Sequence, residues 1–378
     1  MRTVHPCTMI GAYRFEQDRV PRDEFQIRLR ALHGVMDAKG CGAMLIYGDA
    51  REHSELAWFT NFIPRHRWAL ALLPRQGEPR LLVSMSSRDM PAQRLMTWIP
   101  EVMSAWTWES AFDPWLAGLG ADATADIGTL RFDLMRPALM ASIEKSLGNR
   151  FRMVAADSEV HALRSTRPRE LSLIRDACAV VRAGATAFMQ AWRDGMGVEA
   201  AALAGERKAR ALAAQDVRTL VSHDGGRTLA PLAGAFAPQP KDTPLLGYIA
   251  VKHRGYWAEA FVSAADPPRD VHQCAQAGLA AVLGIAAAGI TASELHAKAM
   301  ASLGMPLHPA LSGSIGRRIG FSPNEGGELR PDASHILAAG DVYALHVGAR
   351  DPQAGAVASA MVAITPNGCE VLARPDAA

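Results

Sequence analysis

The first 150 residues alternate between helical and extended patterns. In residues 21–41, apolar side chains recur near helical spacing and Gly40 provides a stop. The apolar positions of this predicted helix are Phe25, Ile27, Leu29, Leu32 and Val35. The continuous apolar run GAMLIYGD that follows, at 42–49, indicates a buried strand. The chain is therefore expected to begin its fold with a helix followed by a strand.

Two more segments of this half have extended patterns. Residues 67–84 hold two apolar runs joined by a polar turn with Gly77 and Pro79, which is typical of a hairpin. Residues 122–134 indicate another short strand. Together these patterns predict a mixed α/β domain over residues 1–160, which is a usual size for a domain.

Helical patterns open the second half. A long amphipathic helix is expected from about His161 to Gly197. Its predicted buried stripe consists of Leu171, Ile174, Cys178, Val181, Ala185 and Phe188. A second helix is expected over 198–215, where good helix formers dominate. Further on, Thr291 stands three residues before Glu294, which is the spacing of a capping box at a helix start.

Strand patterns lie between and after these helices. Residues 244–264 predict two strands around a turn at Arg254 and Gly255. Residues 340–351 and 355–373 add apolar strands, and the second of these segments turns at Asn367-Gly368. The second domain is therefore expected to span 161–378 and to combine helices with strands.

Composition excludes several classes of protein. The 378 residues are 49% hydrophobic and 21% charged, which is ordinary for a globular protein, and the formal net charge is only +2. Such a balance supplies no broad positive field for nucleic acid. The start of the chain lacks a long apolar core, so no membrane partner is expected. The five cysteines are scattered without a CxxC pair, which favours reduced thiols and a cytoplasmic protein.

Several segments resemble, in order, the creatinase, prolidase and aminopeptidase P family. They are 163–177 (LRSTRPRELSLIRDA), 255–261 (GYWAEAF), 316–325 (GRRIGFSPNE), 340–347 (GDVYALHV) and 360–372 (AMVAITPNGCEVL). The resemblance covers nearly the whole chain. It implies a creatinase-type α/β N-terminal domain and a C-terminal α+β pita-bread domain, which is a curved antiparallel sheet backed by helices. It also implies a homodimer.

In the metallopeptidases of this family, two Asp, one His and two Glu hold two metal ions. Transferring those positions onto this sequence places another residue type at all five. The five positions hold Tyr248, Glu259, Arg317, His346 and Ser359. A guanidinium is a permanent cation with no lone pair, so Arg317 would repel a metal ion. The sequence therefore predicts that the protein has no metal site and no other cofactor.

The residues at these positions are suited to another chemistry. An arginine beside a glutamate and a histidine could hold a small anion while Glu259 or His346 exchanges protons. Creatinase itself, as a family member, cleaves a carbon–nitrogen bond without metal through a histidine, and His223 is the imidazole near that position here. The catalytic candidates are therefore Glu259, His346 and His223.

Further residues are candidates for holding a substrate. They are Arg317, Arg318, Tyr248, Ser359, Glu325, Arg65 and Arg67. The last two stand at a loop-to-strand entry, and the family's dimers imply that this region can reach the neighbouring subunit's site. Each candidate also has a structural alternative. Glu259 could form an ion pair that replaced the metal, His346 could be a core histidine, and His223 could be a solvated loop residue.

Two classes of function remain open, with a third behind them. The favoured hypothesis is a metal-independent, creatinase-like enzyme that hydrolyses or otherwise cleaves a carbon–nitrogen bond in a small carboxylate-bearing compound. The alternative is a catalytically inactive pita-bread binding module. A residual Xaa-Pro metallopeptidase comes third. Polar and ionisable replacements favour the enzyme, because burying them without a ligand or partner would be costly.

Overall fold

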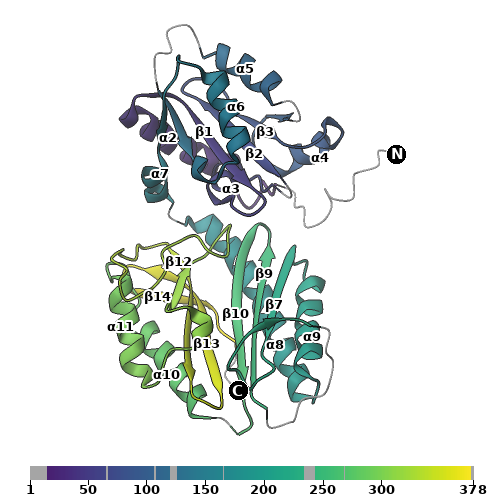
Figure 1. The fold of residues 1–378 in the computed structure, drawn as a ribbon, viewed down its shortest axis with the longest axis vertical. Helices are drawn as coiled ribbons and strands as arrows, with labels where there is room; N and C mark the ends of the chain where they lie inside the picture. Colours follow the sequence, from purple (N-terminus) through teal and green to yellow (C-terminus); the bar gives the residue numbers. More distant parts are fainter. Residues whose placement is uncertain are drawn as a thin grey trace. The chain divides into compact units, whose positions relative to one another are not determined.

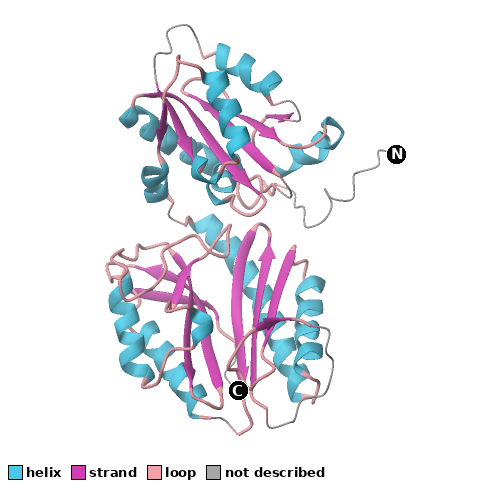
Figure 2. Cartoon of the chain, in the orientation of Figure 1, coloured by secondary structure: helices cyan, strands magenta, loops and turns pink. Residues whose placement is uncertain are grey.

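The computed structural model describes residues 15–64, 67–105, 108–119, 126–164, 166–233, 243–267 and 269–375. The chain divides into two compact units, Met1–Arg164 and Ser165–Ala378. Each unit combines helices with sheets (Figures 1 and 2).

The first unit is built on a six-stranded mixed sheet. Its strand order is β4-β3-β2-β1-β5-β6, with β1 antiparallel to β2 and parallel to β5. The strands are β1 Cys41–Asp49, β2 Trp68–Pro74, β3 Arg80–Val83, β4 Glu101–Ser104, β5 Asp126–Leu130 and β6 Met153–Ala155. The helices are α2 Arg22–Lys39, α3 Ser54–Thr60, α4 Met90–Gln93, α5 Glu109–Ala117, α6 Pro137–Leu147 and α7 Asp157–Leu163. The predicted helix, hairpin and short strand of this half are all present.

Helix α2 ends where the sequence indicates. Gly40 follows it at φ 67°, a left-handed conformation that glycine adopts without cost. Phe25 and Leu32 are fully buried. Arg28 is also buried, with its guanidinium 4.8 Å from the Phe25 ring centroid and 5.5 Å from that of Trp58. Part of this helix's inner face is therefore built by a cation between two aromatic rings.

The second unit contains two four-stranded antiparallel sheets. Their orders are β10-β9-β7-β8 and β11-β12-β13-β14. The first sheet comprises β7 Asp216–Val221, β8 Ala230–Pro231, β9 Leu245–His253 and β10 Tyr256–Ala264. The second comprises β11 Gly316–Arg318, β12 Val342–Arg350, β13 Gly355–Thr365 and β14 Gly368–Ala373. The two sheets meet along β10 and β13, which contact each other.

Two helices accompany each of these sheets (Figure 1). Helices α8 and α9 lie beside the first sheet, and α10 and α11 lie beside the second. They span α8 Pro168–Arg193, α9 Val198–Ala211, α10 Asp270–Leu283 and α11 Ala292–Leu303. At Gly247 in β9, an added Cβ would stand 2.5 Å from the ring of Phe188 in α8. Gly247 therefore faces the helices, and its neighbour Tyr248 faces the opposite side because strand side chains alternate.

Some local predictions needed correction. The helix expected from His161 to Gly197 is two helices, α7 and α8, and Leu171 of its predicted stripe is only half-buried. Strand β7 was not predicted. By contrast, the Thr291–Glu294 capping box is formed, and Arg254 and Gly255 have the positive φ angles of a tight hairpin turn, 49° and 89°.

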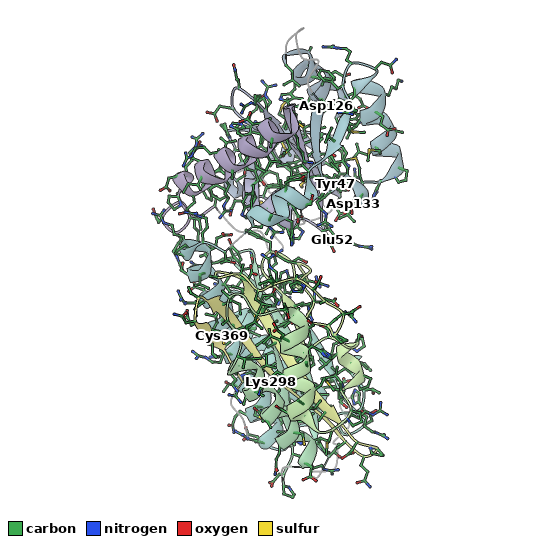
Figure 3. The ribbon with its side chains drawn as sticks, turned by 90° about the vertical axis from the view of Figure 1, so that its left-hand side faces the viewer. Tyr47, Glu52, Asp126, Asp133, Lys298 and Cys369 are labelled. Atoms are coloured by element: carbon green, nitrogen blue, oxygen red, sulfur yellow. The ribbon has the colours of Figure 1, made fainter. Side chains whose placement is uncertain are left out.

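Other sequence features can be located on the fold. Figure 3 shows Cys369, which lies in β14, and Lys298, which lies on α11. The four cysteines of the described part of the chain, Cys41, Cys178, Cys274 and Cys369, form no disulfide. In the same part of the chain, no helix combines the length and apolarity needed to cross a membrane.

Candidate functional site

Four of the five residues at the inferred metal positions meet around one carboxylate. Glu259 lies in β10, and its side chain is 0% exposed. Tyr248 comes from the neighbouring strand β9, Arg317 from β11 and His346 from β12. The cluster thus joins both sheets of the second unit. Antiparallel register brings this about, because Tyr248 faces Phe261, which is two residues from Glu259 on the same face.

Three partners surround the Glu259 carboxylate. The Tyr248 hydroxyl donates to Oε2 at 2.6 Å, and Nη2 of Arg317 donates to the same oxygen at 2.8 Å. Nε2 of His346 lies 3.0 Å from Oε1. Arg317 is fixed further by its Nε, which donates to the Pro323 carbonyl at 2.8 Å. One oxygen of the carboxylate is therefore bound by the phenol and the guanidinium, and the other faces the imidazole.

The cluster favours an ionised Glu259. Burial alone would raise the pKa of this carboxyl, but Arg317, followed by His346 and Tyr248, outweighs burial, and the pKa lies below its usual value. Burial by itself would lower the pKa of the Arg317 guanidinium, but the negative charge of Glu259 outweighs burial. The net effect is a raised pKa for Arg317. Near neutral pH the pair is an ion pair in a buried setting.

The other two groups favour their neutral forms. Burial lowers the pKa of His346 below 6.5, and the opposing attraction of Glu259 does not restore it. Burial, followed by the Glu259 charge, raises the pKa of Tyr248 well above 10. At pH 7, His346 is therefore a neutral imidazole that can accept a proton, and Tyr248 is a hydrogen-bond donor.

A cavity of about 670 Å³ borders this cluster. Arg317, with a quarter of its side chain exposed, lines it together with His346 and Tyr248. Glu259 is not among its described lining residues. A molecule in the cavity would therefore meet the imidazole, the phenol and the guanidinium, while the carboxylate stays behind them.

The remaining candidates on the two sheets have different surroundings. Arg318 lies next to Arg317 in β11, so its side chain leaves the other face of the strand, where it pairs with Asp341 at 3.1 Å. Ser359 stands opposite His346 in the β12–β13 register, and its Oγ accepts a hydrogen bond from the Phe261 backbone N–H at 2.8 Å. That bond links β13 to β10 between the sheets.

Three more candidates lie outside the cluster. His223 follows β7, and its Nε2 is 3.2 Å from Oε1 of Glu199, whose side chain is 1% exposed. The Glu325 carboxylate accepts from the Ser322 backbone N–H at 3.2 Å, within the loop after β11. Arg67 is exposed, in the first unit, with φ 65°.

Arg65 lies outside the described residues. Within the second unit, the structure brings together Tyr248, Glu259, Arg317 and His346. The other candidates of this unit, which are Arg318, Ser359, Glu325 and His223, have the different partners given above.

Several residues of the cavity were not singled out in the sequence. They include Arg218, Phe261, Leu311, Glu328 and Arg330. In β7, the β-branched residues Val217, Thr219 and Val221 stand at alternate positions, which is the signal that could have indicated a strand carrying Arg218. The others come from irregular segments or from the face of a strand. Only the folded sheet shows which of them border the cavity.

Comparison with known proteins identifies the class of this fold. Residues 28–166 match the family described as Creatinase/Prolidase N-terminal domain, and residues 172–366 match Metallopeptidase family M24. No curated protein sequence matches the chain. The second match covers more than half of the chain, and the chain therefore belongs to metallopeptidase family M24, a family of hydrolases.

Solved structures agree with this assignment of the fold. The prolidase from Pyrococcus horikoshii OT3 superposes with a TM-score of 0.76 at 15% identity, covering 93% of this chain and 99% of that chain. The X-Pro aminopeptidase from Thermotoga maritima MSB8 superposes with a TM-score of 0.74 at 18% identity, covering 92% of this chain and 98% of that chain. The dipeptidase PepE from Mycobacterium ulcerans superposes with a TM-score of 0.74 at 17% identity, covering 96% of this chain and 98% of that chain. The predicted fold, a creatinase-type domain followed by a pita-bread domain, is confirmed.

Metallopeptidases of this family hold metal ions, but few donor atoms at the corresponding positions of this chain could bind them. Within the described ranges, no group of three or more His, Cys, Asp or Glu side chains is arranged to hold a metal ion. The cluster offers the carboxylate of Glu259 and the imidazole of His346, and a guanidinium nitrogen of Arg317 already lies 2.8 Å from that carboxylate. A guanidinium cannot donate a lone pair and repels a cation. The residues present do not fit a dinuclear metal centre.

Proposed function

We propose that this protein is a metal-independent hydrolase that cleaves a carbon–nitrogen bond in a small carboxylate-bearing compound. One observation carries the proposal. A neutral His346 lines a 670 Å³ cavity and lies 3.0 Å from a buried carboxylate that Arg317 and Tyr248 hold in its ionised form. An imidazole oriented and charge-balanced by a carboxylate is a recurring arrangement for proton transfer.

Each residue of the cluster has a defined part in the reaction. His346 takes a proton from water as the water oxygen bonds to the carbon of the scissile bond. The resulting imidazolium is stabilised by Glu259, 3.0 Å away. His346 then returns the proton to the nitrogen as the carbon–nitrogen bond breaks. Arg317, which lines the cavity, stabilises the negative charge that develops on the oxygen of the attacked carbon.

The test combines metal analysis with a turnover screen. Protein purified without chelator is expected to hold well under one equivalent of zinc, manganese, iron or cobalt. A panel of N-carbamoyl and N-acyl amino acids, lactams and Xaa-Pro dipeptides is then assayed for amine release with and without EDTA. We expect turnover of a non-dipeptide compound that EDTA leaves unchanged and that His346→Gln lowers about 100-fold or more. Hydrolysis of a dipeptide that depends on added metal would contradict the proposal.

A second candidate is a non-catalytic binding module. The observation in its favour is that Glu259 is completely covered and has three partners, as a structural ion pair would. In that case no compound of the panel is turned over. His346→Gln would then change the stability of the protein, and no activity would be lost.

A further inference from the structure

The cavity beside Glu259 is lined by three arginines whose charges are compensated to different degrees. Arg317 donates to Glu259, and Arg330 pairs with Glu328 and donates to the Ser312 carbonyl at 2.9 Å. Arg218 is the third. Its Nε is 3.5 Å from an Asp216 carboxylate oxygen, and the two side chains are 59% and 41% exposed.

The ion pair of Arg218 is the weakest of the three. An exposed pair at this distance contributes little, because water screens both charges. Asp216 also lies 3.8 Å from Nη2 of Arg210, so a single carboxylate faces two guanidinium groups. Arg218 therefore has the least compensated positive charge on the cavity wall, and an anion in the cavity would be drawn to it.

The sheet places Arg218 in line with the proposed catalytic carboxylate. Arg218 in β7 faces Ala250 in β9, and Ala250 faces Glu259 in β10. Residues directly opposite in an antiparallel sheet share a face, so all three lie on the side of the cavity. Two strand spacings separate the backbones of Arg218 and Glu259, roughly 10 Å. Ala250 between them is buried, and it is not among the described residues that line the cavity.

Arg218 is also held in place. Its guanidinium lies 4.4 Å from the ring centroid of Trp257, a contact that limits its freedom before any ligand arrives. Its position near the cluster has an electrostatic effect. Burial and Glu259 raise the pKa of Tyr248, and the charges of Arg317 and Arg218 act in the opposite direction. Arg218 is thus close enough to act on the cluster without belonging to it.

The rest of the wall favours an apolar group. Leu220, Leu229, Phe261 and Leu311 line the same cavity. A ligand with a carboxylate, a carbon–nitrogen bond and an apolar side chain would match Arg218, His346 and the apolar part of the wall, respectively. The separation of roughly 10 Å between the strands suits a molecule of the size of an N-substituted amino acid, since the arginine and glutamate side chains span part of that distance.

We propose that Arg218 is the residue that binds the carboxylate of the substrate, and that the substrate is an N-substituted amino acid with an apolar side chain. This inference rests on the proposed function for the position of the scissile bond. In this inference Arg218 takes the place of Arg317 and Arg318 as the group that holds the substrate carboxylate. Arg317 is engaged by Glu259, and Arg318 pairs with Asp341 on the other face of its strand.

The experiment compares an acid with its neutral analogue. Binding of N-carbamoyl-leucine and of N-carbamoyl-leucinamide is measured by calorimetry and thermal shift, with the wild type and three variants. We expect the wild type to prefer the acid, and Arg218→Gln to bind the acid about 10- to 100-fold more weakly. Arg210→Gln is the matched control, because Arg210 shares Asp216 but is not among the described residues of the cavity. It is expected to bind like the wild type.

Several outcomes would overturn the inference. The inference is wrong if the wild type binds the acid and the amide equally well, or binds neither. It is also wrong if Arg218→Gln still prefers the acid, or if Arg330→Gln loses that preference instead. Failure of the proposed function would look different. Acid binding that depends on Arg218 but leads to no amine release would remove the hydrolase and leave the anion site in place.

Discussion

Both units of this chain bury a carboxylate against arginine, but with different partners. In the first unit, Glu55 lies between Nη1 of Arg164 and Nη1 of Arg131, each at 3.0 Å. In the second unit, Glu259 has a single guanidinium partner, Arg317, at 2.8 Å. Burial raises and the arginines lower the pKa of Glu55, and the balance lowers it, as it does for Glu259. In their charge state the two carboxylates are alike.

The difference lies in the groups that complete each cluster. Two guanidinium groups around Glu55 are permanent cations, and neither can exchange a proton near neutral pH. Around Glu259, the remaining partners are the imidazole of His346 and the phenol of Tyr248, and both line a cavity. A buried ion pair alone is therefore weak support for function. A buried ion pair with a neutral imidazole at a cavity wall is a specific hypothesis.

The largest expected effect compares Glu259→Gln with Glu55→Gln. Removing one partner of a buried pair leaves an uncompensated charge, and we expect each variant to lose about 3–5 kcal/mol of stability. Scanning calorimetry measures the loss. Activity per folded molecule separates the two: it falls in Glu259→Gln and stays at the wild-type level in Glu55→Gln. Equal activity in the two variants would remove Glu259 from the reaction.

A medium effect is expected from the hydroxyl of Tyr248. It donates at 2.6 Å to an ionised carboxylate, so Tyr248→Phe should cost about 1.5–3 kcal/mol. Tyr343→Phe is the matched control. Its hydroxyl is buried and finds no hydrogen-bond partner among the described residues, so the change should be neutral or slightly stabilising. Chemical denaturation of both variants checks this, and a similar loss in each would show that the Tyr248 bond is not special.

The smallest expected effect is on the pH dependence of stability. The pKa of His346 is lowered in the folded state, so its contribution is fully present above the unfolded pKa of about 6.5 and is lost as pH falls through the folded pKa. Glu259 acts in the same direction at lower pH, because its pKa is also lowered. His346→Gln should therefore lose stability less steeply than the wild type just below pH 6.5. Melting curves of both proteins, recorded from about pH 5 to about pH 8, measure how steeply stability changes with pH. Parallel slopes for the wild type and the variant would contradict the lowered pKa of His346.

The sequence predicted the elements of this comparison better than their contacts. Helical spacing located α2, an apolar run located β1, and a turn between two strand patterns located the hairpin of β9 and β10, because all three are local properties of the sequence. They did not show β7, which carries Arg218. They also did not distinguish Arg317 from Arg318. A single step along β11 turns one side chain toward Glu259 and the other toward Asp341.

The sequence by itself determined the family, the helices and strands with a clear apolar pattern, and the residue types at the inferred metal positions. The tertiary structure decided which of those residues meet. It joined Tyr248, Glu259, Arg317 and His346, used Ser359 to bond β13 to β10, and left His223 beside Glu199. The physical reason is register. The β9–β10 hairpin and the later strands β11 and β12 contribute to the cluster, and only strand pairing in the two sheets fixes which side chains share a face.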